Sequence, residues 1–163
     1  MNKLYKKSEI WFAISWIIVY VVGASIADEL SRLVGIEKVF SVPYLLAMSI
    51  LAIVWMRKNG LFERYGLCKT DVEAKRFIYY VPLIALVSCN FWLGVSKNGS
   101  WAEFALYAAS MLCVGFLEEV IFRGFLFRAM EKDGVRSATA VSSVTFGIGH
   151  IVNLFNGSGA ELL

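Results

Sequence analysis

Histidine, proline and cysteine are scarce in this sequence, which has one histidine, two prolines and three cysteines among 163 residues. The three cysteines, Cys68, Cys89 and Cys113, are odd in number and lack metal-ligand spacing, so we expect free, buried thiols. Charged residues are only 18% of the chain, and the basic ones are dispersed rather than gathered into one patch. Nucleic acid is therefore not expected as a partner.

Hydrophobic residues make up 58% of the chain, with five Trp, seven Tyr and twelve Phe. This composition is too apolar for one soluble domain of this size. We therefore expect an all-α fold, a polytopic transmembrane helix bundle that forms a single membrane domain over residues 1–163. Its surroundings would be the lipid bilayer, as in a multi-pass protein of a bacterial cell membrane.

Apolar runs of sufficient length predict about five membrane spans. They cover residues 10–27, 39–56, 77–96, 102–128 and 137–155. A cleaved secretory signal is the alternative for the first run, but that run is long for a signal and further spans follow. If the N-terminus is cytoplasmic, 13 Lys and Arg lie on the inner side and three on the outer side. This bias predicts a cytoplasmic N-terminus.

Two adjacent carboxylates and a guanidinium lie inside the fourth apolar segment, as Glu118, Glu119 and Arg123. Ionisable groups at that depth are costly unless they are paired, so they indicate a functional site. On a helix, Glu119 and Arg123 are one turn apart and can form an ion pair, while Glu118 points about 100° away. Glu118 is therefore the carboxylate that we expect to take part in chemistry.

The hairpin made by the last two spans, residues 101–156, should bring the sole histidine, His150, to the level of Glu118. Gly134 lies at the turn, and both residues lie 16 positions from it. Antiparallel neighbours then carry them at similar depth.

The last span presents Phe146, His150 and Asn153 on one helical face. Small residues on the same span, among them Ser143 and Gly147, predict close packing against the preceding helix.

A carboxylate and an imidazole that converge in a poorly hydrated site can activate a water. One alternative is structural, with Glu118, Glu119 and Arg123 in an ion-pair knot and His150 bonded to a backbone carbonyl. Another is a metalloprotease-like zinc site with Glu118, Glu119 and His150 as ligands. One histidine and two diverging glutamates are a poor zinc set, so we expect no metal and no other cofactor.

The sequence EEVIFR at residues 118–123, followed by FGIGH at residues 146–150, resembles the EExxxR and FxxxH motifs of the CPBP intramembrane proteases. This family contains the type II CAAX prenyl endopeptidases and bacterial relatives linked to bacteriocin processing and immunity. Asn153 adds an HxxN continuation often seen in bacterial members. The resemblance implies that Glu118 activates water, that His150 assists it, and that Arg123 supports the site.

The chain departs from the family pattern at a third motif, which is absent here because no second histidine follows His150. In the family this motif is thought to stabilise the oxyanion, and losing one oxyanion donor typically costs about 10²- to 10³-fold in rate. We therefore expect a fragment of a longer protein, an inactive relative, or a chain whose missing helices come from a second chain.

The function that we expect is that of an intramembrane endopeptidase of the CAAX protease type. It would hydrolyse a bond of a peptide or membrane-protein substrate near the cytoplasmic half of the membrane, with Glu118 as general base. The alternative is a non-catalytic membrane protein for bacteriocin immunity or scaffolding. A transporter or ion-pathway subunit would also use buried Glu and Arg, but no repeat or broken helix supports it.

Overall fold

A computed structural model describes residues 1–69, 72–73, 75–76, 80–88 and 100–153, and for residues 83, 86–88 and 150–153 it describes the backbone alone. Every regular element of these residues is a helix, which confirms the predicted all-α class. The elements are α1 (Asn2–Lys7), α2 (Glu9–Val34), α3 (Ser41–Lys58), α4 (Val81–Ser88), α5 (Trp101–Glu118), η3 (Glu119–Leu126), α6 (Phe127–Met130), η4 (Glu131–Asp133) and α7 (Val135–Asn153).

Three helical stretches of the described chain are long and apolar enough to cross a bilayer: Glu9–Val34, Ser41–Lys58 and Trp101–Asp133. They lie over three of the five predicted spans. Most of the predicted span at 77–96 falls outside the described residues, although α4 lies within it. The 19-residue helix α7 covers most of the predicted span at 137–155, so five remains the predicted number of spans.

Local signals set the ends of the long helices. The Ser8 side chain accepts a hydrogen bond from the Trp11 N–H at 3.3 Å and caps α2, which ends at Gly35 in the left-handed region (φ 73°). A capping box begins α5, because Ser100 Oγ accepts from the Glu103 N–H at 3.2 Å and the Ser100 N–H donates to Glu103 Oε2 at 2.8 Å. These caps satisfy N–H groups that helices leave without backbone partners.

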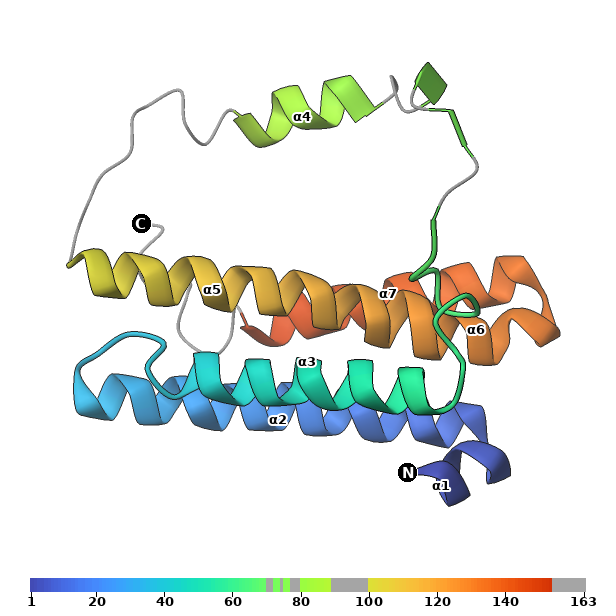
Figure 1. Cartoon of the computed structure of the whole chain (residues 1–163), viewed down its shortest axis with the longest axis horizontal. Coiled ribbons are helices and arrows are strands. Elements are labelled where there is room, and N and C mark those ends of the chain that lie inside the picture. Colours follow the sequence, from blue (N-terminus) through green and yellow to red (C-terminus); the bar gives the residue numbers. More distant parts are fainter. Residues whose placement is uncertain (70–71, 74, 77–79, 89–99, 154–163) are drawn as a thin grey trace.

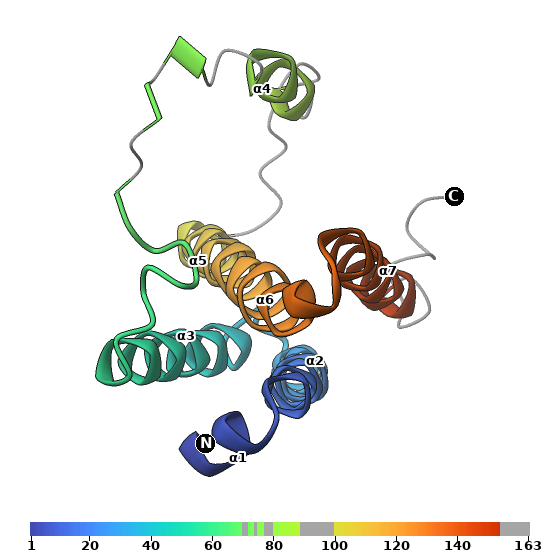
Figure 2. The same cartoon turned by 90° about the vertical axis from the view of Figure 1, so that its right-hand side faces the viewer.

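The run from α5 to α6 lies at the centre of the bundle (Figures 1 and 2). Helix α3 packs on α5, α2 packs on η3 and on α3, and α7 packs on η3 and α6. Helix α2 and helix α7 run antiparallel to the central run, whereas α3 runs parallel to it (Figure 1). This central run of α5, η3 and α6 therefore lies between α2 on one side and α7 on another.

Phe125 of η3 is the centre of the packed core. Its ring is 2% exposed, and its centroid lies 5.2 Å from Phe12, 5.5 Å from Trp16, 5.6 Å from Trp55 and 5.0 Å from Tyr65. Edge-to-face and tilted ring pairs at these distances contribute more stabilising free energy than the burial of their surface alone. One side chain thus joins η3 to α2, to α3 and to the segment after α3.

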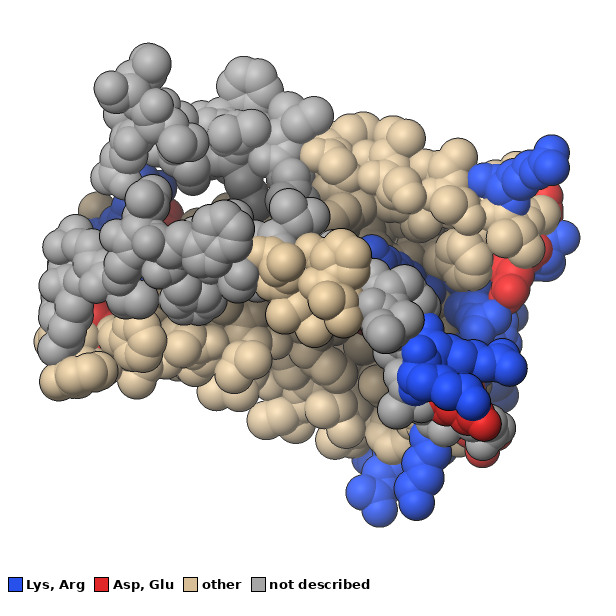
Figure 3. Space-filling model, turned by 90° about the horizontal axis from the view of Figure 1, so that it is seen from above, with Lys and Arg blue, Asp and Glu red and all other residues tan. Residues whose placement is uncertain are grey.

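Basic side chains gather at one end of the molecule (Figure 3). This end holds the N-terminus, the last turn of α3 and the turn between α6 and α7 (Figure 1). The last turns of α1, α3, α6 and η4 carry Lys6, Lys7, Arg57, Lys58, Arg128 and Lys132. Several basic residues assigned to the inner side from the sequence thus share one end, and the cytoplasmic orientation of that end stays a prediction.

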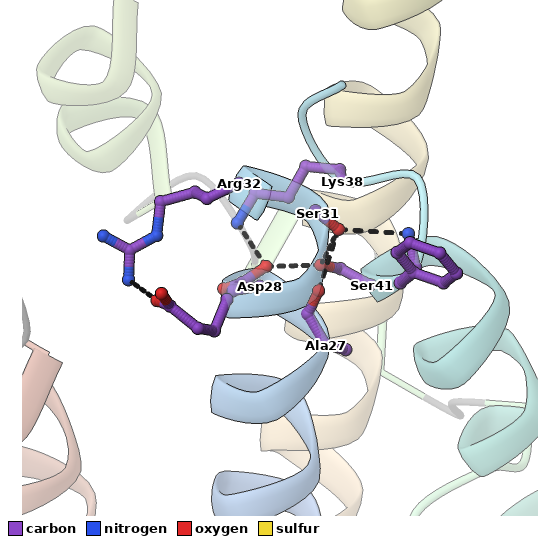
Figure 4. A network of polar contacts seen from close by, with 8 residues as sticks. Ala27, Asp28, Ser31, Arg32, Lys38 and Ser41 are labelled. Atoms are coloured by element: carbon purple, nitrogen blue, oxygen red, sulfur yellow. Dashed lines mark hydrogen bonds and ion pairs between the residues drawn. The ribbon is translucent and has the colours of Figure 1, made fainter. Parts of the chain in front are cut away.

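The opposite end of the α2–α3 pair is closed by a polar network (Figure 4). Lys38 Nζ lies 2.9 Å from Asp28 Oδ1, Arg32 pairs with Glu29, and Ser41 donates to Asp28. Lys38 and Arg32 are thus both paired with carboxylates on α2.

We predict that Phe125→Ala destabilises the protein by roughly 3–5 kcal/mol, because it removes a large buried ring and leaves a cavity. Unfolding in detergent, followed by tryptophan fluorescence, measures the change. Phe104→Ala on α5 is the control, since Phe104 is 54% exposed and should cost far less. Equal losses for the two variants would contradict the role given to Phe125.

Candidate functional site

The two glutamates lie where the central run changes its helical form. Glu118 is the last residue of α5, and Glu119 is the first residue of η3, which is π-helical. The sequence predicted one regular helix over residues 102–128. Six of the eight residues of η3 are buried, and Glu119 and Arg123 are exposed. π-Helical segments are rare, and those that occur inside α-helices are frequently at functional sites.

The predicted ion pair between Glu119 and Arg123 is present in the structure. Arg123 Nη1 lies 3.1 Å from Glu119 Oε2, and the two side chains are 73% and 63% exposed within the chain. The pair places a charge-balanced group beside Glu118.

A cavity of about 180 Å³ opens between the central run and α7. Its lining residues are Gly115, Glu118, Glu119, Phe122, Arg123, Ser142, Ser143 and Phe146. Four of the predicted site residues therefore line one cavity: Glu118, Glu119, Arg123 and Phe146.

A larger cleft of about 720 Å³ shares Glu119, Arg123, Ser142 and Ser143 with this cavity. It extends to Tyr65 and to the Arg128–Glu131 ion pair, whose closest atoms are 2.8 Å apart. Burial and a 3.4 Å hydrogen bond to the Tyr5 hydroxyl raise the pKa of Tyr65, which therefore stays neutral in the wall of the cleft. The cleft is lined by paired charges, hydroxyl groups and aromatic rings.

The register between η3 and α7 is set by Phe122 and Phe146, whose rings meet edge to face at 5.4 Å and 80°. Glu118 lies four residues before Phe122, and position 150 lies four residues after Phe146. In an antiparallel pair these steps lead in the same direction, so the backbone at residue 150 is at the level of Glu118. The side chains of His150 and Asn153 lie outside the described residues, and their contacts stay predictions.

The small residues of α7 pack as the sequence predicted at some positions and not at others. Ala138 and Ser142 are buried against the central run, at 0% and 7% exposed, whereas Ser143 lines the cavity. A methyl group added at Gly147 would meet no described atom within 4 Å. The predicted close packing is therefore present at Ala138 and Ser142, and the contact predicted at Gly147 is not seen among the described residues.

Tyr20 on α2 was missed by the sequence analysis. Its hydroxyl donates to Glu118 Oε1 at 3.4 Å, and the residue is 7% exposed. The signal that could have found it is a stripe of aromatic residues at Phe12, Trp16 and Tyr20, spaced by one helical turn and ending in the one ring that has a hydroxyl. Helix α2 therefore contributes a polar group to the site.

The described side chains offer few ligands for a metal ion near Glu118. Among the described side chains no three or more His, Cys, Asp or Glu come together as ligands for a metal ion. The alternative zinc set of Glu118, Glu119 and His150 includes the His150 side chain, which lies outside the described residues. The prediction of free, buried thiols is confirmed for Cys113 and wrong for Cys68, which is exposed on the segment after α3. Cys89 lies outside the described residues.

Comparison with known families gives a match over the segment that contains the cavity. Residues 100–162 match the family model for type II CAAX prenyl endopeptidase Rce1-like proteins. The predicted resemblance is confirmed over this segment, which contains α5, η3, α6, η4 and α7. No curated protein and no solved structure gives a match. The match supports a protease-type function for a membrane protein.

Proposed function

We propose that the protein is an intramembrane endopeptidase in which Glu118 activates the water that hydrolyses a peptide bond. The observation that carries this proposal is the position of Glu118 in the wall of a cavity between the central run and α7. The cavity lies within the segment that matches the protease family. It also includes the ion-paired Glu119 and Arg123, so the EExxxR motif lies along its wall.

In the proposed reaction, Glu118 takes a proton from a water as the water oxygen attacks the scissile carbonyl carbon. The same carboxyl group then returns the proton to the leaving amine as the carbon–nitrogen bond breaks. His150, at the same level of α7, holds the water or polarises the carbonyl. Arg123 neutralises Glu119 at 3.1 Å, so Glu118 does not face a second, uncompensated carboxylate.

The remaining predicted residues have supporting roles in this proposal. Phe146 packs against Phe122 and forms an apolar wall of the cavity. Asn153 follows His150 by three positions, which is helical spacing for one face, and in this proposal its amide donates to the substrate.

The larger cleft supports a position for the scissile bond near the basic end of the bundle. It joins the cavity at Glu119, Arg123, Ser142 and Ser143 and continues to Arg128 and Glu131. Water and a polar peptide segment can therefore approach Glu118 along paired charges and hydroxyl groups rather than across the apolar outer faces of the helices.

We predict that Glu118→Gln lowers kcat for peptide hydrolysis by about 10²-fold or more, because the amide cannot accept the proton of the water. Cleavage of a quenched fluorescent peptide library by the protein in proteoliposomes, with products identified by mass spectrometry, measures it. Glu63→Gln is the matched control, since Glu63 is exposed on the segment after α3 and outside both clefts. Full activity in the Glu118 variant would contradict the mechanism.

The same variant separates proteolysis from a role in bacteriocin immunity or scaffolding. A proteolytic role predicts that any protective phenotype in cells is lost with Glu118→Gln while the protein remains in the membrane at its normal level. A phenotype that survives this substitution argues for the non-catalytic function.

The proposed mechanism is independent of metal, since the carboxylate itself activates the water. We predict that dialysis against 1,10-phenanthroline leaves hydrolysis unchanged. Loss of activity that is restored specifically by zinc would overturn this part of the proposal and favour the ligand set Glu118, Glu119 and His150.

A further inference from the structure

Tyr20 reaches Glu118 from a helix that lies outside the family-matched segment. Its hydroxyl lies 3.4 Å from Glu118 Oε1, which is long for a hydrogen bond between a hydroxyl and a carboxylate. Catalytic hydrogen bonds are often long in unliganded structures and shorten when substrate is present. The residue is nevertheless fixed, because it is 7% exposed and belongs to the main hydrophobic core.

The position of the Tyr20 hydroxyl follows from the packing of α2 against η3. Trp16 and Phe12, one and two turns before Tyr20, pack against Phe125 at 5.5 and 5.2 Å. Because α2 runs antiparallel to the central run, a step of one turn beyond Trp16 leads back along that run towards Glu118 (Figure 1). The aromatic core therefore sets where the Tyr20 hydroxyl lies relative to the carboxylate.

We propose that Tyr20 is a positioning residue for Glu118, whose hydroxyl holds Oε1 so that the second carboxylate oxygen is presented to the water. A glutamate side chain has three rotatable bonds, and an ordered donor restricts them to one arrangement. A hydrogen bond to the ionised form also keeps the carboxylate ready to accept a proton. The proposal rests on the function proposed for Glu118 and brings the N-terminal part of the chain into the site.

The hydroxyl can be tested apart from the ring. Tyr20→Phe keeps the aromatic ring in the core and removes only the donor. The matched control is Tyr44→Phe on α3, because the Tyr44 hydroxyl donates to the Val19 carbonyl of α2 at 2.6 Å, next to Tyr20 in the chain. That variant also loosens a contact of α2, but it leaves the donor to Glu118 in place.

The first readout is catalysis of the peptide library. We expect Tyr20→Phe to lower kcat by roughly tenfold with KM nearly unchanged, which is the scale expected for loss of a hydrogen bond to a charged group. Tyr44→Phe should keep kcat near that of the parent protein.

The second readout does not depend on proteolysis. It is the rate at which dicyclohexylcarbodiimide modifies Glu118 at neutral pH, which peptide mass spectrometry measures. This reagent attacks protonated carboxyl groups in apolar sites, so loss of the donor should speed the reaction. Replacing Tyr20 by difluorotyrosine, whose more acidic hydroxyl is a stronger donor, should slow it. The difluorotyrosine protein provides the answer if Tyr20→Phe does not fold.

The outcomes distinguish this inference from the proposed function. Modification rates that are equal in the parent, Tyr20→Phe and difluorotyrosine proteins would overturn the positioning role. So would a kcat that is unchanged in Tyr20→Phe. If no form of the protein hydrolyses peptides and the modification rates still change as predicted, Tyr20 positions Glu118 and the protease function is wrong.

Discussion

The packing of one ring, Phe125, determines where the candidate site can form. Its ring contacts rings from α2, from α3 and from the segment after α3, so η3 cannot rotate without breaking these contacts. With the apolar residues of η3 turned into this core, Glu119 and Arg123 are left on the opposite face, towards α7. In a bilayer, where helix association depends on packing and hydrogen bonds rather than on removal of apolar surface from water, such a contact is especially important.

The site is completed from two antiparallel neighbours of the central run. Helix α2 brings Tyr20 to Glu118, and α7 brings Phe146 to Phe122 and the backbone of residue 150 to the level of Glu118. Each neighbour is aligned by an aromatic contact, and one turn farther along lie the Tyr20 hydroxyl on α2 and the backbone of residue 150 on α7. The same physical arrangement thus stabilises the fold and places the groups of the site, so substitutions in the aromatic core should change both stability and activity.

Much of this arrangement could be predicted from the sequence because it depends on composition and local spacing. Apolar run lengths predicted the helical class, and the one-turn spacing of Glu119 and Arg123 predicted their ion pair. Glu118 and His150 are the same number of residues from Gly134, and this predicted that residue 150 lies at the level of Glu118. The π-helical form of η3 and the contact of Tyr20 with Glu118 could not be predicted in this way. The Tyr20 contact arises from tertiary packing, since it joins residues 98 positions apart in the chain.

Cysteine cross-linking can show whether residue 150 faces Glu118, with Glu118→Cys and His150→Cys combined and the native cysteines replaced by serine. We predict that a short bifunctional thiol reagent joins this pair as readily as Phe122→Cys with Phe146→Cys, because the rings of Phe122 and Phe146 are 5.4 Å apart. Glu118→Cys with Thr139→Cys should not react, because position 139 is about 16 Å farther along α7 at 1.5 Å per residue. Cross-linking at 122 and 146 without cross-linking at 118 and 150 would contradict the account, since Glu118 would then lack the imidazole that the proposed mechanism requires.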